Sequence, residues 1–167
     1  MYTEPSGEIQ STVETVADFV EEELIPLEDD FLGEEGAELE EALEAKRDRV
    51  REMGLWTPHL PETWGGAGLS LQEFALVAEE LGRSPFGHYV FNCQAPDAGN
   101  MEILIEHGTD EQQEKNLQPL LDGEIRSCFA MTEPDRPGAN PTWMETRAER
   151  DGDDYVINGR KWFTSGA

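Results

Sequence analysis

Residues 128–140 hold the side chains whose types and spacing best suit chemistry in this 167-residue chain. Phe129 and Met131 have the bulk typical of a strand, and Pro134 and Pro137 prevent that strand from continuing. A loop rich in glycine and proline can place several backbone N–H groups around one concave space, which suits an anion or the polar edge of a flat cofactor. The residues alone leave a second interpretation open, because a Thr-Glu-Pro sequence is also typical of an ordinary turn.

Three motifs extend this signal along the chain. They read LPETWGGAGLS at 60–70, GEIRSCFAMTEP at 123–134 and YVINGRKWFTSG at 155–166. The second motif resembles the flavin-binding signature of the acyl-CoA dehydrogenase family. The third resembles that family's second flavin segment, and the first is similar to its helix-connecting loop. The motifs occur in the family's order and at its spacing, so the resemblance covers essentially the whole chain.

The resemblance implies a reaction, a cofactor and partners. Members of the family use FAD to oxidise acyl-CoA thioesters to trans-2-enoyl-CoA. A carboxylate base removes the α proton while a hydride passes from the β carbon to flavin N5, and an electron-transfer flavoprotein takes the electrons. Residues 95–101 and 131–135 are similar to a branch of the family associated with longer or modified acyl chains.

The resemblance also implies which residues lie against FAD. Thr132 is expected to reach the N5/O4 edge of the isoalloxazine with its hydroxyl and backbone, where it would stabilise the charge of reduced flavin. An aromatic ring and a hydroxyl from the third motif are expected to pack beside the flavin. The expected cofactor-binding residues are Phe129, Met131, Thr132, Gly138, Ala139, Phe163 and Ser165.

Some of these positions depart from the family pattern. Gly138 and Ala139 align with small residues beside the FAD pyrophosphate and the thioester, but family members commonly carry serine and aspartate where this chain has Ala139 and Asn140. One phosphate hydrogen bond is worth about 1.5–3 kcal/mol, so loss of the serine hydroxyl is expected to weaken flavin binding by about one to two decades. Pro141 removes another donor. Phe163 replaces a common tryptophan and keeps its stacking without the indole N–H.

No catalytic residue is assigned, because the family's catalytic glutamate is expected beyond residue 167. General base catalysis is typically worth about 10²–10⁴-fold, so this polypeptide alone is expected to show little or no dehydrogenase turnover. One hypothesis is a truncated or split acyl-CoA dehydrogenase completed by a complementary chain or homo-oligomer, which the retained Phe129, Thr132 and Ser165 favour. The alternative is a non-catalytic helical interaction module or gene remnant, which Ala139 and the end of the sequence at Ala167 favour.

The composition restricts the partners and the environment. With 12 Lys and Arg against 37 Asp and Glu, the formal net charge is −25 at pH 7, which makes nucleic acid and anionic membrane surfaces poor partners. The acidic residues are spread over most segments, so we interpret them as the surface of a halophilic, haloarchaeal protein. The chain has no apolar signal core and no run of membrane-spanning length, which predicts a cytoplasmic protein without a membrane partner.

The two cysteines and three histidines indicate neither a metal site nor a disulfide framework. Cys128 lies among apolar residues of the expected strand and is predicted to be a small buried residue rather than a nucleophile. No catalytic role is assigned to His59, His88 or His107.

Apolar residues at three- and four-residue steps predict the helices that precede residue 123. Pro26 and Pro119 are expected to end or bend the helices that contain them. Three arginines at 47, 49 and 51 are interpreted as a solvated face at a helix C-terminus, where cations are favoured, rather than as a phosphate site. The predicted helices span 7–27, 35–53, 71–81, 97–107 and 110–121.

The pattern changes from helical to strand-like after Gly123. Asn158-Gly159 is a strong hairpin signal, and Asp151 to Asp154 indicates a further turn. The sequence therefore predicts an α+β fold that is mainly α. A helical domain of about five helices at 1–123 precedes the first antiparallel strands of an incomplete, flavin-contacting β domain at 124–167. The predicted strands span 125–132, 143–149, 155–157 and 160–165.

Overall fold

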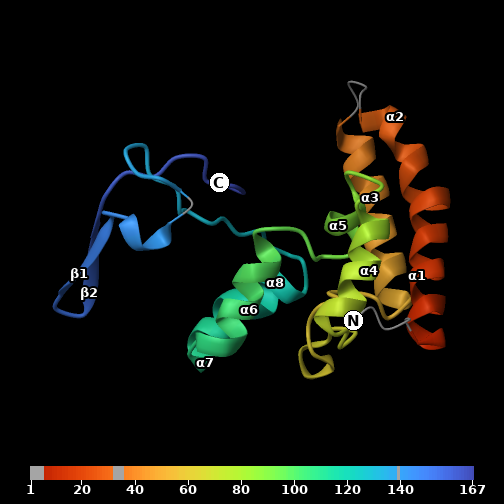
Figure 1. Ribbon diagram of the computed structural model, residues 1–167, viewed down its shortest axis with the longest axis horizontal. Helices are drawn as coiled ribbons and strands as arrows, with labels where there is room; N and C mark the ends of the chain where they lie inside the picture. Colours follow the sequence, from red (N-terminus) through yellow and green to blue (C-terminus); the bar gives the residue numbers. More distant parts are fainter. Residues whose placement is uncertain (1–5, 32–35, 139) are drawn as a thin grey trace.

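The computed structural model describes residues 6–31, 36–138 and 140–167. Figure 1 shows these parts in a row, with α1 to α5 at one end, α6 to α8 in the middle and the two strands at the other end. The chain is mainly helical and carries one antiparallel pair of strands, which confirms the predicted fold class. The helical parts precede the strands in sequence, so the candidate site at 129–165 follows the helical part.

The first helical path continues past its proline. It runs through α1 (Gly7–Phe19), a π-helical turn (Val20–Leu24), a 3-10 turn (Ile25–Leu27) and α2 (Glu28–Phe31). Pro26 has no N–H for the carbonyl four residues earlier, and its ring crowds that carbonyl. A wider π turn, which ends two residues before the proline, and the 3-10 turn that contains it replace regular α-helix here. The proline therefore changes the helix type locally rather than ending the helix.

The remaining helices follow the predicted spans closely. Two capping boxes begin helices, one in which Ser70 pairs with Glu73 and one in which Thr109 pairs with Gln112. A second π-helical turn at Gln113–Leu117 stands directly before the helical turn that contains Pro119. The helices are α3 (Gly36–Glu52), α4 (Leu71–Leu81), α5 (Gly87–Val90), α6 (Asp97–His107), α7 (Asp110–Gln112) and α8 (Gln118–Leu121), with 3-10 turns at Glu62–Trp64 and Pro141–Trp143.

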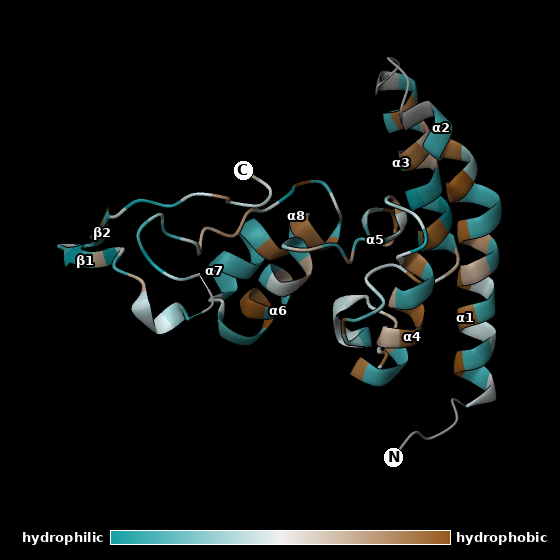
Figure 2. Ribbon diagram, turned by 45° about the horizontal axis from the view of Figure 1, so that its top comes forward, coloured by the Kyte–Doolittle hydropathy of each residue, from teal (hydrophilic) through white to brown (hydrophobic). Residues whose placement is uncertain are grey.

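Two apolar clusters form the described core. The larger one joins α1, α3, α4 and α5, and the smaller one joins α6, α8 and the connector that contains Leu60. Figure 2 shows hydrophobic and hydrophilic residues alternating along these helices, as amphipathic packing requires. The larger cluster contains Ile9, Val16, Phe19, Val20, Leu24, Leu43, Val50, Val77, Leu81, Phe86, Val90, Phe91 and Cys93.

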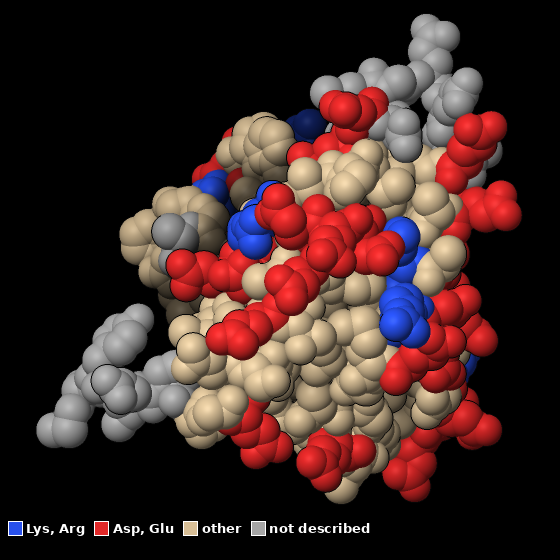
Figure 3. Space-filling model, turned by 90° about the vertical axis from the view of Figure 1, so that its right-hand side faces the viewer, with Lys and Arg blue, Asp and Glu red and all other residues tan. Residues whose placement is uncertain are grey.

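Acidic side chains cover much of the outer face of the larger helical group. Figure 3 views the side of the molecule that carries α1 and shows many Asp and Glu with few Lys and Arg. Two of the basic groups are paired, since Lys46 contacts Glu23 and Arg83 contacts both Glu21 and Glu80. Within the described residues, no helix combines the length and the apolar character needed to cross a membrane.

The strands differ from the prediction in extent, and of the two predicted turns only the one at Asp151 to Asp154 is confirmed. β1 (Arg147–Asp151) pairs with β2 (Asp154–Asn158), so Arg147 lies opposite Asn158, and the chain reverses at Gly152 with a φ of 66°. The prediction of a hairpin turn at Asn158-Gly159 is therefore wrong. A Cβ on Gly159 would lie 2.1 Å from the Thr146 hydroxyl, so glycine serves a close approach here rather than a turn.

The predicted strands at 125–132 and 160–165 do not form regular strands. They meet in a single bridge between Phe129 and Ser165. Phe163 has a φ of 49°, which is not an extended conformation and interrupts the second segment. The pairing of these segments is nevertheless what brings the candidate site residues together.

Candidate functional site

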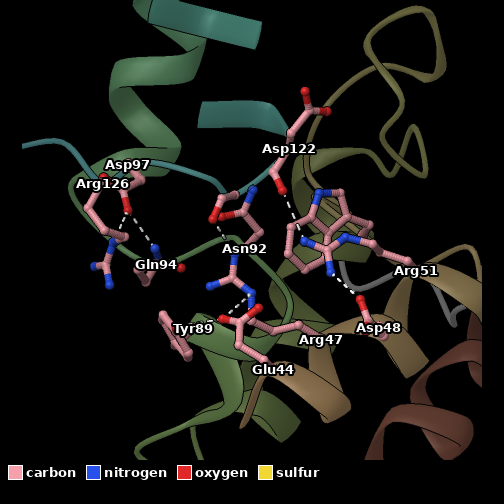
Figure 4. Close-up of polar contacts among 12 residues, drawn as sticks. Glu44, Arg47, Asp48, Arg51, Tyr89, Asn92, Gln94, Asp97, Asp122 and Arg126 are labelled. Carbon is pink, nitrogen blue, oxygen red and sulfur yellow. Dashed lines mark hydrogen bonds and ion pairs between the residues drawn. The ribbon is translucent and has the colours of Figure 1, made fainter. Parts of the chain in front are cut away.

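The end of α8 is held by side chains from the other helical group. The carbonyl oxygens at 120–123 accept hydrogen bonds from Asn92 (3.1 and 3.2 Å), Trp56 (2.7 Å), Arg51 (2.9 Å) and Arg47 (3.0 Å). The last carbonyls of a helix have no partner within the helix, and cations are favourable at that end. Figure 4 shows Arg51 pointing toward Asp122, with Arg47 and Asn92 nearby. These hydrogen bonds fix the position at which the chain leaves the helical part.

Arg47 corrects the solvated-face interpretation of the arginine cluster. Its side chain is only 1% exposed, and its guanidinium lies 5.0 Å from the centroid of Trp56 and 4.6 Å from that of Tyr89. A sequence signal was present, because Leu43, Arg47 and Val50 share the i, i+4, i+7 spacing of one helix face. The arginine occupies the buried stripe because two aromatic rings and a carbonyl receive its charge.

A buried carboxylate fixes the segment immediately before the candidate site. Asp97 accepts hydrogen bonds from the Ser127 amide (2.7 Å), the Arg126 guanidinium (2.6 Å) and Gln94 (2.5 Å). Burial alone would raise the pKa of Asp97, but the hydrogen bonds from Ser127 and the Arg126 charge outweigh it and lower the pKa. Figure 4 shows Arg126, Asp97 and Gln94 together. Sequence reasoning did not single out Asp97.

The segments 129–132 and 162–165 lie antiparallel in one register. The amide of Phe129 donates to the Ser165 carbonyl (3.2 Å), and the amide of Trp162 donates to the Thr132 carbonyl (3.1 Å). The partner of the first residue, Phe129, is Ser165, and three residues later the partner of Thr132 is Trp162, three residues earlier. This is the order that antiparallel pairing requires. Expected site residues from the second and third motifs are therefore brought together.

The side chains on these segments form a partly polar, aromatic surface. Phe129 is 47% exposed and Phe163 is 82% exposed, and the Phe163 ring lies 5.0 Å from that of Trp162. Among the described residues, the hydroxyls of Thr132 and Ser165 have no hydrogen-bond partner. Exposed rings next to available hydroxyl donors are the groups that fit a flat, partly polar ligand.

The remaining expected site residues are distributed as follows. A Cβ built on Gly138 would lie 3.5 Å from the Thr132 hydroxyl, so the loop glycine is beside Thr132. The carbonyl of Met131 accepts a hydrogen bond from the Lys161 ammonium at 2.8 Å. Ala139 lies outside the described residues.

Glu133 and Lys161 are site residues that sequence reasoning missed. Glu133 is 6% exposed and lies 3.0 Å from the Lys161 ammonium. Both residues stand inside the quoted motifs, which is the signal that could have found them. Hydrogen bonds from Thr146, followed by the ammonium of Lys161, lower the pKa of Glu133 to about 2.

A small pocket lies in the connector between α3 and α4. It has a volume of about 350 Å³ and is lined by His59, Pro61, Glu62, Gly68 and Leu69. Burial lowers the pKa of His59 to about 4, so its imidazole is neutral near pH 7. In the part of the chain that the structure describes, no group of His, Cys, Asp and Glu is suited to hold a metal ion.

The buried position predicted for Cys128 is wrong, because this cysteine is exposed. The strand that would have covered it is reduced to the bridge at Phe129. Cys93 is the buried cysteine, and burial raises the pKa of its thiol to about 12.

Comparison with known families decides what this arrangement belongs to. The model of the acyl-CoA dehydrogenase N-terminal domain matches residues 6–124, and the model of the acyl-CoA dehydrogenase middle domain matches residues 128–167. The chain belongs to the acyl-CoA dehydrogenase family. The segment 129–132 therefore opens the part that matches the middle domain, and α1 to α8 form the part that matches the N-terminal domain.

Relatives in animals support this membership. The chain is 51% identical over 124 residues to human acyl-CoA dehydrogenase family member 11, which covers 72% of this chain and 16% of that protein. It is 50% identical over 125 residues to the chicken protein of the same name, covering 75% and 16%. This acyl-CoA dehydrogenase chain thus spans about one sixth of the length of these curated relatives.

Solved structures share the fold. A structure from Mycobacterium abscessus named as an acyl-CoA dehydrogenase superposes with a TM-score of 0.87 at 42% identity, covering 98% of this chain and 44% of that one. Glutaryl-CoA dehydrogenase from Mycobacterium smegmatis in complex with FADH2 gives a TM-score of 0.70 at 27% identity, covering 96% and 39%. An acyl-CoA dehydrogenase from Bacillus anthracis complexed with FAD superposes with a TM-score of 0.69 at 26% identity. The match covers 96% of this chain and 27% of that one.

Proposed function

We propose that this chain supplies the helical domain (1–123) and the first flavin-contacting segments (124–167) of an FAD-dependent acyl-CoA dehydrogenase. The observation that carries the proposal is the antiparallel pairing of 129–132 with 162–165. This pairing places exposed aromatic rings and hydroxyl donors on adjacent segments that the second and third motifs supply. The same groups are those expected to lie against the isoalloxazine.

The residues present fit a flavin in chemical type. The rings of Phe129 and Phe163 offer apolar contact, and the hydroxyls of Thr132 and Ser165 offer hydrogen bonds. Thr132 would donate toward the polar edge of the ring system, and the glycine at 138 would leave room beside it. FAD, when bound, would supply the acceptor for the hydride of an acyl-CoA substrate.

The described carboxylates nearest to these segments are poorly suited to the role of catalytic base. Glu133 is ion-paired with Lys161 and has a pKa of about 2, and Asp97 is held by Arg126 and Ser127. A general base works best when its pKa lies near the operating pH. Neither carboxylate is therefore proposed as the base, which the family resemblance places beyond residue 167, and we expect little or no turnover from this polypeptide alone. A measured turnover with an acyl-CoA and an artificial electron acceptor would contradict this expectation.

The visible absorption spectrum of the chain, purified in molar salt, tests the proposal directly. After addition of FAD and removal of free flavin by desalting, retained and perturbed flavin absorbance is expected. Because the serine of the family pattern is replaced by Ala139, binding is expected to be about one to two decades weaker than with that hydroxyl, and Ala139→Ser should strengthen it. Complete loss of flavin from both proteins on desalting would contradict the proposal.

A non-catalytic helical module is the second candidate. One observation favours it: the helical part has its own apolar clusters, whereas every residue of β1 and β2 is exposed. A module of this kind would use the helical surface to bind a partner and would not retain flavin. The desalting experiment separates the two candidates, since retained flavin supports only the first.

Partners and environment follow from the first candidate. The substrate would be an acyl-CoA thioester and the electron acceptor an electron-transfer flavoprotein, with a complementary chain or a second copy completing the site. The charge of −25 and the acidic surface in Figure 3 support a halophilic environment. A role in fatty acid metabolism would follow from the acyl-CoA substrate. Reconstitution of turnover on addition of the complementary chain would test the assembly.

A further inference from the structure

The carboxylate of Glu133 joins three separate segments of the candidate site. It accepts hydrogen bonds from the amides of Glu145 (2.7 Å) and Thr146 (2.8 Å) and from the ammonium of Lys161 (3.0 Å). A buried carboxylate is costly unless it is paired and hydrogen-bonded, and here both conditions are met. Residue 133 directly follows the segment 129–132, so this carboxylate is rigidly placed at one end of that segment.

Lys161 makes the matching contacts from the other segment. Its ammonium donates to the Met131 carbonyl (2.8 Å) as well as to Glu133, and it approaches the Met144 sulfur at 3.4 Å. The side chain is mostly buried. The next residue, Trp162, donates its amide to the Thr132 carbonyl, which is one of the two backbone hydrogen bonds described between the segments.

Only two backbone hydrogen bonds are described between the segments 129–132 and 162–165, so the backbone contributes little to fixing their register. A slip of one residue turns every side chain of an extended segment to its opposite face. Phe129 and Phe163 are exposed, so apolar burial does little to prevent such a slip. At this end of the pairing, the Lys161 ammonium reaches both Glu133 and the Met131 carbonyl, so these side-chain contacts join the two segments in the register observed.

We propose that Glu133 and Lys161 are positioning residues that set the register of 129–132 against 162–165 and so present Thr132 and the aromatic rings to a flavin. The flavin part of this inference rests on the proposed function, whereas the register part does not. The carboxylate stays charged over the working pH range, because hydrogen bonds from Thr146 and then the ammonium of Lys161 lower its pKa to about 2.

The register is tested on the apoprotein by amide hydrogen exchange of the full chain in molar salt. In Lys161→Met, the amides of Phe129 and Trp162 are expected to lose protection by at least about tenfold, because both amides are bonded only in this register. Amides of α4 should be unchanged. Lys161→Arg, which keeps the charge, should restore most of the protection. The matched control is Lys115→Met, which removes the same charge from an exposed position.

Unchanged protection of Phe129 and Trp162 in Lys161→Met would overturn the positioning role. FAD titration of the same variants provides the second measurement, with binding at least about tenfold weaker in Lys161→Met than in Lys115→Met. Equal binding in the two variants would also overturn the inference while leaving the proposed function intact. If the unaltered chain binds no FAD, the proposed function fails, and the exchange experiment still decides the register.

Discussion

The guanidinium of Arg47 donates a hydrogen bond to the carbonyl oxygen of Gly123 at 3.0 Å, across 76 residues of sequence. Arg47 lies near the end of α3, and Gly123 is the point at which the chain leaves α8 for the candidate site. Gly123 has a φ of 72°, and a Cβ there would lie 2.0 Å from the Arg47 guanidinium. The direction in which the chain enters the site thus depends on this contact.

Gly123→Ala is expected to destabilise the fold more than Gly54→Ala. The two glycines have nearly equal φ, 72° and 71°, so each substitution carries a backbone cost of about 1–2 kcal/mol. A Cβ at Gly54 meets nothing within 4 Å, whereas at Gly123 it meets Arg47 and, at 2.9 Å, Trp56. Overpacking should add ~1–3 kcal/mol at Gly123. Urea denaturation in molar salt measures the free energy of unfolding of both variants. Equal destabilisation would contradict the close approach of Arg47 and Trp56 to Gly123.

Arg47→Met is expected to lower the free energy of unfolding by roughly 2–4 kcal/mol. The change leaves the Gly123 carbonyl without its donor and removes the cation stacked between Trp56 and Tyr89. Arg49→Met is the matched control, because Arg49 lies on the same helix, is 64% exposed and pairs only with Glu52 among the described residues. Its expected cost is below about 1 kcal/mol. Similar losses in the two variants would show that Arg47 contributes no more than a surface charge.

The lowered pKa of the buried His59 predicts that the protein loses stability in mild acid. Its pKa is lowered from 6.5 to about 4 in the folded state by burial, so between these values the unfolded chain binds the proton more readily. The stabilising contribution is complete above pH 6.5 and is lost as the pH falls toward 4. Relative to His59→Gln, the unaltered chain should lose on the order of 1–3 kcal/mol over this range. Parallel pH profiles of the two proteins would contradict the shift.

The two cysteines are expected to differ in reactivity toward a thiol reagent at pH 8. Cys128 is exposed, whereas Cys93 is buried and has a pKa of about 12. Because the thiolate is the reactive form, Cys93 should react at least about 100-fold more slowly in the folded protein. Cys128→Ser should remove the fast phase of the reaction. In that variant the Cys93 thiol should react slowly in the folded protein and become accessible when denaturant unfolds the chain. A fast phase that survives Cys128→Ser would contradict the assignment.

The melting temperature is expected to rise with salt. The Debye length falls from about 10 Å at 0.1 M to about 3 Å at 1 M, which screens the repulsion within a chain of net charge −25. Each 1 kcal/mol gained should raise the melting temperature by ~2–4 °C. Replacement of the exposed acids Glu8, Asp18 and Glu22 by their amides should reduce the slope against sodium chloride. A slope that the three substitutions leave unchanged would attribute the effect to something other than charge.

Most of the helical part could be predicted from the sequence because its signals are local. The capping boxes at Ser70 and Thr109 join residues three positions apart, and the apolar stripes repeat within one or two turns. Even the prolines were informative, although Pro26 changes the helix type rather than ending the helix. The family motifs likewise depend on residue order alone, and the matching domain models confirm the family.

The extent of the strands, the pairing of 129–132 with 162–165 and the polar contacts could not be predicted in the same way, although the turn at Asp151 to Asp154 was. Asn158-Gly159 carries a strong local turn signal, but β2 finds its partner in β1, and the glycine is needed for its approach to Thr146. Cys128 is exposed because its segment gains only one bridge. A strand forms only where a partner is placed beside it, and that placement is not a local property of the residues.

The family, the positions and caps of the helices, and the acidic character of the chain could all be inferred from the order of the residues. The burial of Arg47 against Gly123 and the pairing of Glu133 with Lys161 became visible only in the folded chain. The two groups of features differ because of distance along the chain. Caps and helix faces involve neighbours a few residues apart, whereas these two contacts join residues 76 and 28 positions apart. A charged side chain is buried only where the folded chain brings such a partner to it.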